Sequence, residues 1–210
     1  LLLPISSLFS SKMKLFIEGR KHSFKILKEK INPNKKYVWF HVASLGEYEQ
    51  GLPVIEALRK EQPELGIVLT FFSPSGYEIR KNNTIADVTL YLPLDTKANV
   101  KRFLNLVKPI QAFFIKYEFW PNYLTELKKR NVPTYLISGI FRENQLFFKP
   151  YGGFYREALK TFTHFFVQNE TSKQLLQQLH FNNVTVNGDT RFDRVLQIKQ
   201  AAKHLPICEA

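Results

Sequence analysis

Short apolar runs alternate with longer amphipathic stretches along most of this chain. From residue 37 onward, runs rich in β-branched and aromatic residues are separated by stretches of about ten to fifteen residues whose apolar positions recur at helical spacing. The runs are nearly continuous rather than alternating in polarity, which is typical of strands buried on both faces of a parallel sheet. The pattern predicts strands at 37–42, 67–72, 88–92, 110–115, 134–137, 164–167 and 184–186, and helices at 47–62, 74–82, 97–107, 121–130, 151–161, 171–179 and 193–203.

Strands that alternate with helices predict an α/β fold, here a Rossmann-like open parallel sheet of about seven strands with helices on both faces. In such a sheet, ligands bind beyond the carboxyl ends of the strands, so the strand-to-helix junctions are the places where chemistry is expected. No junction carries the G-x-G-x-x-G or G-x-x-x-x-G-K-[ST] pattern. The sequence therefore disfavours a dinucleotide-dependent dehydrogenase and excludes a P-loop nucleotidase.

A basic segment precedes the predicted sheet. Residues 12–31 place apolar side chains near helical spacing with Lys and Arg between them, which predicts an amphipathic helix with a possible break at Gly19. Two interpretations stay open: the helix packs on the domain with a solvated basic face, or it rests on anionic lipid headgroups. In the second interpretation, the cations that face the membrane are Lys12, Lys14, Arg20, Lys21, Lys25 and Lys28.

Net charge and composition narrow the choice of partners. The 210 residues carry a formal charge of +12, and nine Lys and Arg against two Glu lie between residues 12 and 36. Such a charge suits a nucleic acid, an anionic membrane surface or a phosphorylated substrate. A hydrophobic fraction of 44% excludes wholesale disorder, and one Cys with five scattered His predicts neither a disulfide framework nor a metal site. No run of eighteen apolar residues is present, so no membrane-spanning helix is predicted.

The junction after the first predicted strand holds the main candidate for catalysis. The segment HVASLGE at 41–47 ends a strand, passes through Ser44 and Gly46, and opens a helix with Glu47. One interpretation is structural, because Ser44 and Glu47 have the spacing of a capping box and a carboxylate in the first helical turn complements the helix dipole. The other is chemical, because a Glu at the ligand edge of the sheet can act as a general base toward a hydroxyl.

Two further junctions carry polar side chains. Ser73 and Ser75 stand at a predicted helix start, where they can bind a phosphate, although Ser73 followed by Pro is more common as a simple helix cap. After the fourth predicted strand, Lys116, Glu118 and Trp120 crowd the ligand edge. Glu118 is therefore a candidate for an electrostatic or positioning role.

The last two junctions offer cations. Arg142 follows the fifth predicted strand in a polar segment that continues into aromatic residues at 147–154. This combination suits an acceptor with a charged head and apolar tails, or equally a helix that buries its aromatic side chains in the core. Arg191, near the end of the predicted sheet, can pair with a substrate phosphate or simply with Asp189 or Asp193.

Several of these motifs together resemble a known family. The run VWFHVASLGE at 38–47 is similar to the amino-terminal signature of the 3-deoxy-D-manno-octulosonic acid (Kdo) transferases, and EFWPN at 118–122, QNE at 168–170 and GDTRFD at 188–193 follow in that family's order. The resemblance covers roughly residues 37–195. Three positions depart from the family: Arg191 stands where Lys is usual, Lys116 where many relatives have an acid, and Arg142 is displaced from the expected Arg.

The resemblance implies the amino-terminal half of a GT-B glycosyltransferase that moves Kdo from CMP-Kdo onto the lipid A precursor, with inversion and without a metal or other cofactor. Glu47 would be the base that deprotonates the acceptor hydroxyl, and Glu118 a second essential acid of the acceptor site. The other residues expected to contact the acceptor or support the transition state are Ser44, Gly46, Ser73, Ser75, Arg142 and Arg191.

The same resemblance implies a division of the chain and a cellular place for it. Residues 1–36 would be a basic membrane-proximal segment, 37–195 the acceptor-binding domain, and 196–210 the start of the link to a carboxyl-terminal donor-binding domain. Without that second domain the chain alone is expected to be inactive. The expected partners are the lipid A precursor, CMP-Kdo and an anionic membrane at the cytoplasmic face of the inner membrane of a Gram-negative bacterium, with no nucleic acid.

Two other classes of function stay open. A GT-B transferase with another nucleotide-sugar donor would share the sheet and the Glu at the helix start. A non-catalytic nucleic-acid-binding module would use the charge of +12 and would bind DNA with a steep salt dependence. The clustering of the cations in one amphipathic segment, and the lack of RNP-type aromatic signatures, argue against the second class.

Overall fold

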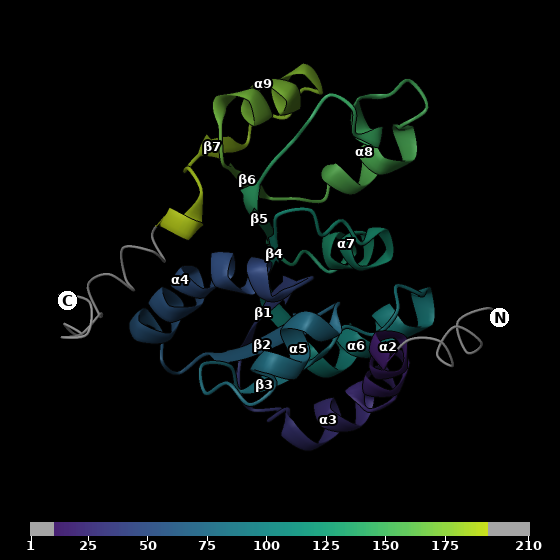
Figure 1. Cartoon of the computed structure of the whole chain (residues 1–210), viewed down its shortest axis with the longest axis vertical. Coiled ribbons are helices and arrows are strands. Elements are labelled where there is room, and N and C mark those ends of the chain that lie inside the picture. The colour runs from purple at the N-terminus through teal and green to yellow at the C-terminus, as the bar shows by residue number, and fades with distance from the viewer. Residues whose placement is uncertain (1–10, 193–210) are drawn as a thin grey trace, which may run out of the picture.

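A single parallel sheet of seven strands runs through the computed structural model, which describes residues 11–192 (Figure 1). The strand order is β3-β2-β1-β4-β5-β6-β7, so the chain reverses its direction of travel across the sheet between β3 and β4. The strands are β1 (Tyr37–Val42), β2 (Gly66–Phe71), β3 (Val88–Tyr91), β4 (Pro109–Ile115), β5 (Thr134–Gly139), β6 (His164–Val167) and β7 (Val184–Val186). The predicted Rossmann-like α/β fold with an open parallel sheet of seven strands is confirmed.

Strand β1 lies at the centre of the sheet, between β2 and β4. All six of its residues are buried, as are all six of β2. This burial on both faces explains why these strands read as continuous apolar runs rather than alternating ones. Because the chain builds the sheet outward from β1 to β3 and then continues with β4 on the other side of β1, the connections that follow β1 and β4 leave in opposite directions. A ligand crevice is expected at that point, beyond the carboxyl ends of these two strands.

Helices cover the sheet in two layers (Figure 1). On one face, α4 (Leu45–Glu61) packs over β1 and β4, and α5 (Pro74–Arg80) packs beside it over β2. The other face is covered by α6 (Lys97–Val107), α7 (Pro121–Lys129), α8 (Gly153–Leu159) and α9 (Glu170–Gln178). Each layer encloses its own cluster of buried apolar side chains.

The basic segment forms two helices that pack on the sheet domain. The predicted break is wrong in position, because α2 (Ser11–Lys21) continues through Gly19 and the chain bends at His22 before α3 (Ser23–Lys30). Gly19 instead allows α2 to lie close to Tyr91, since a Cβ at residue 19 would lie 2.2 Å from the Tyr91 ring. Leu27 is fully buried and Ser23 donates a hydrogen bond to the Tyr91 carbonyl at 2.8 Å.

The helix predicted at 151–161 is shorter in the structure, where a 3₁₀ turn, η1 (Leu146–Phe148), precedes α8. Gly152 closes this turn so tightly that a Cβ would lie 1.8 Å from the carbonyl oxygen of Leu146. The helix predicted at 193–203 lies outside the described residues. Within 11–192, no helix is both long and apolar enough to cross a membrane.

Candidate active site

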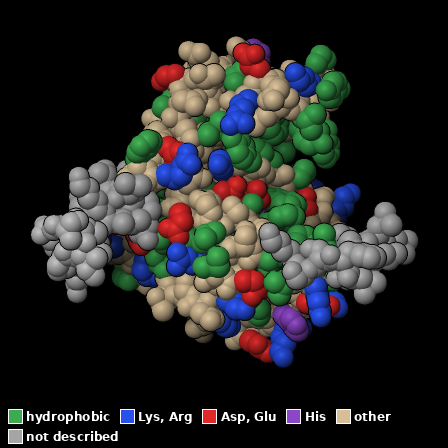
Figure 2. Space-filling model, viewed as in Figure 1, with side chains coloured by type: hydrophobic (Ala, Val, Ile, Leu, Met, Phe, Trp, Pro, Cys, Tyr) green, Lys and Arg blue, Asp and Glu red, His purple; other side chains and the backbone are tan. Residues whose placement is uncertain are grey.

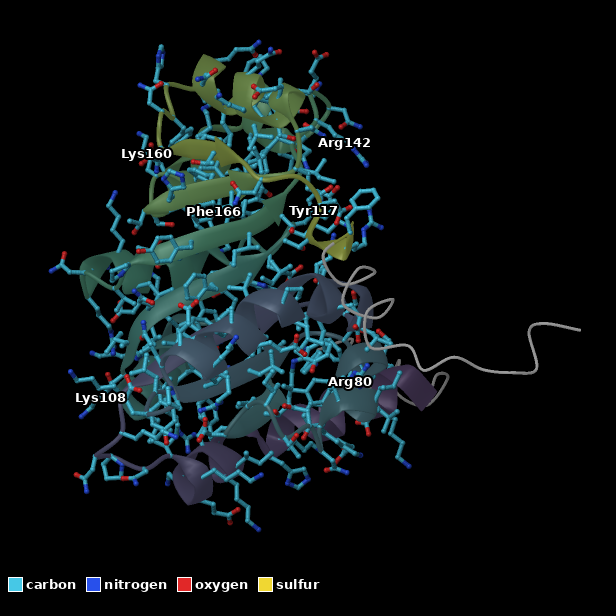
Figure 3. All side chains as sticks on the ribbon, turned by 90° about the vertical axis from the view of Figure 1, so that its left-hand side faces the viewer. Arg80, Lys108, Tyr117, Arg142, Lys160 and Phe166 are labelled. Carbon is cyan, nitrogen blue, oxygen red and sulfur yellow. The ribbon has the colours of Figure 1, made fainter. Side chains whose placement is uncertain are left out.

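The carboxyl ends of the strands form one side of the molecule. In Figure 3, Tyr117 and Arg142, which follow β4 and β5, lie on one side, whereas Lys108 and Lys160, which precede β4 and β6, lie on the opposite side. The side with Tyr117 and Arg142 faces the viewer in Figures 1 and 2. The predicted site residues Glu47 and Glu118 follow β1 and β4, so they belong to this edge.

Glu47 folds back onto its own strand-to-helix turn. Its Oε2 accepts a hydrogen bond from the backbone N–H of Ala43, and the N–H of Ser44 also favours its ionised form. Ser44 is the N-cap of α4, yet its hydroxyl makes no capping bond. The reciprocal capping box is therefore not formed, and the Glu47 carboxylate is held at the end of β1 by main-chain donors.

The surroundings of Glu47 raise its pKa from the ordinary 4.5 to about 7. Burial is the main cause, and the nearby charge of Glu118 adds to it, while the Ala43 N–H and the ammonium of Lys116 act in the opposite direction. A carboxylate with this pKa exists in both protonation states at neutral pH. That is the property expected of a general base that accepts a proton and releases it in each cycle.

Glu118 is fixed in place by two donors on a single oxygen. Its Oε2 lies 2.9 Å from Nε1 of Trp120 and 3.0 Å from Nε2 of His41. The side chain is only 11% exposed. The electrostatic interaction between Glu118 and Glu47 means that the first and fourth junctions meet at one place, as expected at the ligand edge of a parallel sheet.

Behind Glu118, a polar chain runs into the core. Nδ1 of His41 lies 2.8 Å from the Thr70 hydroxyl, which accepts a hydrogen bond from the Trp39 indole at 2.8 Å. No motif in the sequence assigns a role to His41 or Thr70. The alternation within β1 puts Trp39 and His41 on one face, but the partner Thr70 depends on the pairing of His41 with Thr70 between β1 and β2, which the sequence does not encode locally.

The second junction lies beside the first. Ser73 caps α5 by accepting a bond from the Ser75 N–H at 3.3 Å, and its own N–H donates to the Ala43 carbonyl at 2.7 Å. Ser73 is therefore a helix cap in the structure, as one of the two interpretations predicted. Gly46 is exposed, and a Cβ there would meet nothing within 4 Å, so open space adjoins the start of α4.

Two residues at this edge hold unusual backbone conformations. Lys116, directly after β4, has φ of 67°, and Ser138, near the end of β5, has φ of 53°. The left-handed region is unfavourable for residues with a Cβ, and such residues concentrate at functional sites. Lys116 has this backbone conformation, and its ammonium group is near enough to Glu47 to lower the pKa of the Glu47 carboxyl.

The two predicted arginines differ in their surroundings. Arg142 is exposed, and its guanidinium has no hydrogen bond or ion pair with any residue between 11 and 192. Arg191 instead forms an ion pair with Asp189, whose other oxygen accepts a bond from Gln50 of α4 at 3.2 Å. The intramolecular alternative for Arg191 is thus the one present in the structure.

The basic segment presents most, but not all, of its cations to solvent. Lys14, Lys21, Lys25 and Lys28 are exposed, with Lys21 and Lys25 paired to neighbouring Glu residues. The side chain of Lys12 lies outside the described residues.

Arg20 departs from the expectation of a membrane-facing cation. Its guanidinium turns inward and donates to the carbonyls of Leu92, Phe72 and Phe16 at 3.0, 2.6 and 3.0 Å. It also lies over the Phe16 ring, 3.5 Å from the centroid. Burial lowers the pKa of Arg20 to about 10. Arg20 therefore anchors α2 to the ends of β2 and β3 rather than serving as a surface charge.

Aromatic side chains after β5 divide between core and surface. Phe147 is buried, whereas Phe154 is 69% and Tyr151 75% exposed. Figure 2 shows hydrophobic side chains gathered over η1 and α8, on the face that carries the carboxyl ends of the strands. The core interpretation therefore holds for Phe147, and contact of the exposed Tyr151 and Phe154 with an acceptor stays a prediction. In the described part of the chain, no group of three His, Cys, Asp or Glu side chains is placed to hold a metal ion.

Comparison with known proteins decides the family. Residues 18–194 match the family model of the 3-deoxy-D-manno-octulosonic-acid transferase (kdotransferase). The chain belongs to the Kdo transferase family. Among its relatives, the Kdo transferase of Haemophilus influenzae is 36% identical over 103 residues, covering 48% of this chain and 24% of the relative. That of Rickettsia bellii is 30% identical over 161 residues, covering 76% and 38%.

Solved structures show the same fold at low sequence identity. The UDP-GlcNAc 2-epimerase of Neisseria meningitidis, bound to UDP-GlcNAc, superimposes with a TM-score of 0.60 at 17% identity and covers 79% of this chain and 50% of its own. The corresponding epimerase of Methanocaldococcus jannaschii gives a TM-score of 0.57 at 18% identity, covering 81% and 50%. The chain therefore has the fold of about half of each of these epimerase chains. It spans well under half the length of the two Kdo transferases from Haemophilus and Rickettsia.

Proposed function

We propose that this chain is the acceptor-binding half of an inverting Kdo transferase of lipopolysaccharide core biosynthesis. Its family membership supports the transfer of Kdo, and the position of Glu47 and Glu118 at the ligand edge of the sheet supports acceptor binding there. The donor is CMP-Kdo, held mainly by a second domain, and the acceptor is the lipid A precursor.

In the proposed reaction, Glu47 takes the proton of the acceptor hydroxyl. The oxygen then forms a bond to the anomeric carbon of Kdo, while the bond from that carbon to the CMP phosphate breaks and CMP leaves with the electron pair. Attack from the side opposite to CMP inverts the configuration, and no metal takes part. The ammonium of Lys116 and the exposed guanidinium of Arg142 are suited to the phosphates of the acceptor.

The single observation that carries this proposal is the Glu47 carboxylate, whose pKa is raised to about 7 at the carboxyl end of the central strand. The test uses the full-length enzyme with CMP-Kdo and the lipid A precursor. Glu47→Ala is expected to lose at least about 10²-fold in kcat, as removal of a general base does. Glu61→Gln, which changes an exposed carboxylate at the other end of α4, is the control and is expected to stay near wild type. Retention of turnover by a folded Glu47→Ala enzyme would remove the base from the mechanism.

The proposal includes peripheral binding to an anionic membrane at the cytoplasmic face of the Gram-negative inner membrane. The exposed ammonium groups of α2 and α3 and the exposed aromatic side chains of α8 support it. Deleting the basic segment would be a poor test, because Leu27 and Arg20 bind it to the domain core. A variant with Gln in place of Lys14, Lys21, Lys25 and Lys28 keeps those contacts. It is expected to bind less to vesicles that contain phosphatidylglycerol, with no change on zwitterionic vesicles, and equal binding to the anionic vesicles would exclude the role of these lysines.

A further inference from the structure

His41 is a buried polar residue to which the proposed reaction gives no task. It lies in β1 with no exposed surface, against the rings of Phe114 and Trp120 at centroid distances of 5.8 and 5.9 Å. Both of its ring nitrogens have partners: Nδ1 lies 2.8 Å from the Thr70 hydroxyl and Nε2 lies 3.0 Å from Glu118 Oε2. The imidazole therefore links the interior of the sheet to a carboxylate at the ligand edge.

The hydrogen positions in this link follow from what each group can donate. An ionised Glu118 only accepts hydrogen bonds, so the hydrogen between it and His41 is on Nε2. The indole N–H of Trp120 lies 2.9 Å from both His41 Nε2 and Glu118 Oε2. Because Nε2 is already a donor, the Trp120 N–H is directed to Glu118. Two N–H groups thus converge on one carboxylate oxygen and fix its position.

Thr70 completes the arrangement on the other side of the imidazole. Its hydroxyl accepts the Trp39 indole N–H at 2.8 Å, so its own hydrogen is free for a second partner. That hydrogen has His41 Nδ1 within 2.8 Å and the Phe40 carbonyl at the longer distance of 3.3 Å. With its hydrogen on Nε2, His41 has Nδ1 free to accept, and the Thr70 hydroxyl is the donor within reach.

We propose that His41 is a positioning residue, which holds the Glu118 carboxylate in place at the edge that carries Glu47, and which is itself fixed by Thr70 and, through Thr70, by Trp39. The inference rests on the proposed function, since the orientation of Glu118 matters for catalysis only if this edge is the active site. A histidine that merely filled the core could be satisfied within the sheet. His41 instead reaches a carboxylate that is 11% exposed and is a member of the site.

The consequence for catalysis lies in the coupling of the two carboxylates. The charge of Glu118 raises the pKa of Glu47, and the charge of Lys116 lowers it, so the base depends on where Glu118 is held. Loss of the His41 donor removes one of the two N–H groups that hold Glu118 Oε2, and so loosens the position of the carboxylate. Misplacement of a site group by about 1 Å can cost about 10²-fold in rate.

The first test reads the hydrogen on His41 directly and needs no turnover. Long-range ¹H–¹⁵N correlation spectra of the ¹⁵N-labelled chain distinguish a hydrogen on Nε2 from one on Nδ1. His164, whose Nε2 lies 2.8 Å from the Thr185 hydroxyl on β7, provides an internal comparison away from the site. The expected result is a His41 Nε2–H. A neutral ring with its hydrogen on Nδ1 alone would overturn the proposal, because Glu118 could not then accept from it.

The second test measures turnover by the full-length enzyme. His41→Leu is expected to lower kcat about 10²-fold with a smaller change in the acceptor KM. His41→Gln, whose amide can still donate to Glu118, is expected to retain more of kcat than His41→Leu. His164→Gln is the matched control, since it alters a histidine–threonine contact on another strand. If His41→Leu fails to fold, Thr70→Val is the second variant, because valine has nearly the shape of threonine. It is expected to lower kcat as well.

The outcomes separate this inference from the proposed function. If folded His41→Leu and Thr70→Val both turn over like wild type while Glu47→Ala does not, the positioning role is wrong and the base stands. If Glu47→Ala is also active, the proposed function fails. An equal reduction of kcat in His41→Gln and His41→Leu would also contradict a role that depends on the N–H donor, because the Gln amide can supply one and the Leu side chain cannot.

Discussion

Glu118 lies close enough to Glu47 for its negative charge to raise the pKa of the Glu47 carboxyl. The two residues come from junctions separated by more than two complete strand–helix units, and the parallel sheet brings them to one edge because β1 and β4 are neighbours. Neither carboxylate is neutralised by an ion pair with Lys or Arg among residues 11–192. Glu118 is thus held by the side-chain donors of His41 and Trp120, and Glu47 by the main-chain donors of its own turn.

Removal of the Glu118 charge is expected to lower the pKa of Glu47. Glu118→Gln keeps the shape and the acceptor oxygen of the side chain but removes the repulsion that disfavours ionisation of Glu47. The pKa should fall below about 7 and stay above the ordinary 4.5, because burial remains. A ¹³C NMR titration of glutamate-labelled chain, with the Glu47 signal identified by its loss in Glu47→Gln, measures this value. An unchanged or higher pKa in Glu118→Gln would show that the two charges do not interact.

Removal of the Lys116 charge is expected to have the opposite effect. The ammonium of Lys116 favours the ionised form of Glu47, so Lys116→Gln should raise the pKa of Glu47 above its wild-type value. The same titration measures the shift. Lys128→Gln, on the exposed surface of α7, is the charge-matched control and should leave the pKa unchanged. Equal titration curves for Lys116→Gln and wild type would place Lys116 outside the electrostatic reach of the site.

Two glycines near the site should respond to alanine in opposite ways. At Gly46, in the first turn of α4, an added Cβ meets nothing within 4 Å, and alanine is expected to stabilise the chain by about 0.5–1 kcal/mol through helix propensity. At Gly76, the Cβ would lie 2.5 Å from the Phe71 ring and 2.9 Å from the backbone nitrogen of Leu45. Gly76→Ala should therefore lower the free energy of unfolding by about 1–3 kcal/mol. Urea unfolding of both variants measures the difference, and equal stabilities would contradict the packing described.

Full-length Gly46→Ala also probes the acceptor site. Because the alanine methyl group would project into open space beside the start of α4, an acceptor that packs there should bind less well although the protein is more stable. The expected result is a higher acceptor KM in Gly46→Ala, measured at saturating CMP-Kdo. An unaltered KM would move the acceptor away from Gly46.

Asp87 is expected to contribute to stability in a way that is lost in acid. Burial acts to raise the pKa of Asp87, but bonds from Lys35, the Ile67 N–H and Arg59 outweigh it and lower the pKa from 3.8 to about 2. A carboxyl whose pKa is lower in the folded state stabilises the fold above its unfolded pKa, and this stabilisation disappears as the pH falls from about 4 toward 2. Asp87→Asn should cost about 1 kcal/mol at pH 7, since the group is partly solvated.

The comparison for Asp87 is the pH dependence of unfolding by urea. Wild type should lose stability between pH 4 and pH 2 more steeply than Asp87→Asn, and Glu64→Gln, which changes an exposed carboxylate before β2, should follow wild type. Parallel curves for wild type and Asp87→Asn would mean that the ion pairs of Asp87 with Lys35 and Arg59 carry no net stabilisation.

Strand positions could be predicted closely because buried parallel strands have a strong signature. The predicted limits of β1, β6 and β7 agree with the structure, β2 is shifted by one residue, and β3, β4 and β5 differ by one or two residues at one end. The helix predicted at 151–161 was less predictable. The chain makes a tight turn at Gly152, next to the Leu146 carbonyl, so α8 begins only at Gly153, two residues after the start that the spacing of apolar residues indicates. The direction of the Arg20 side chain was also hidden, since its carbonyl partners lie on β-strand ends far away in sequence.

For the site, the sequence identified the residues at each junction but not the contacts among them. Glu47 and Glu118 could be predicted because each follows a strand of one parallel sheet, and such ends meet at one edge. His41 and Thr70 could not, because their contact depends on the register of β1 against β2. For Arg191, the sequence left two partners open, the neighbouring Asp189 and a substrate phosphate, and the structure contains the ion pair with Asp189.

The titration of Glu47 itself tests the central claim most directly. A ¹³C NMR titration of the wild-type chain, with the signal identified through Glu47→Gln, should give a carboxyl pKa near 7, and the acid limb of kcat for the full-length enzyme should follow the same ionisation. A Glu47 pKa near the ordinary 4.5, with turnover unchanged across pH 5 to 8, would contradict the assignment of Glu47 as the general base.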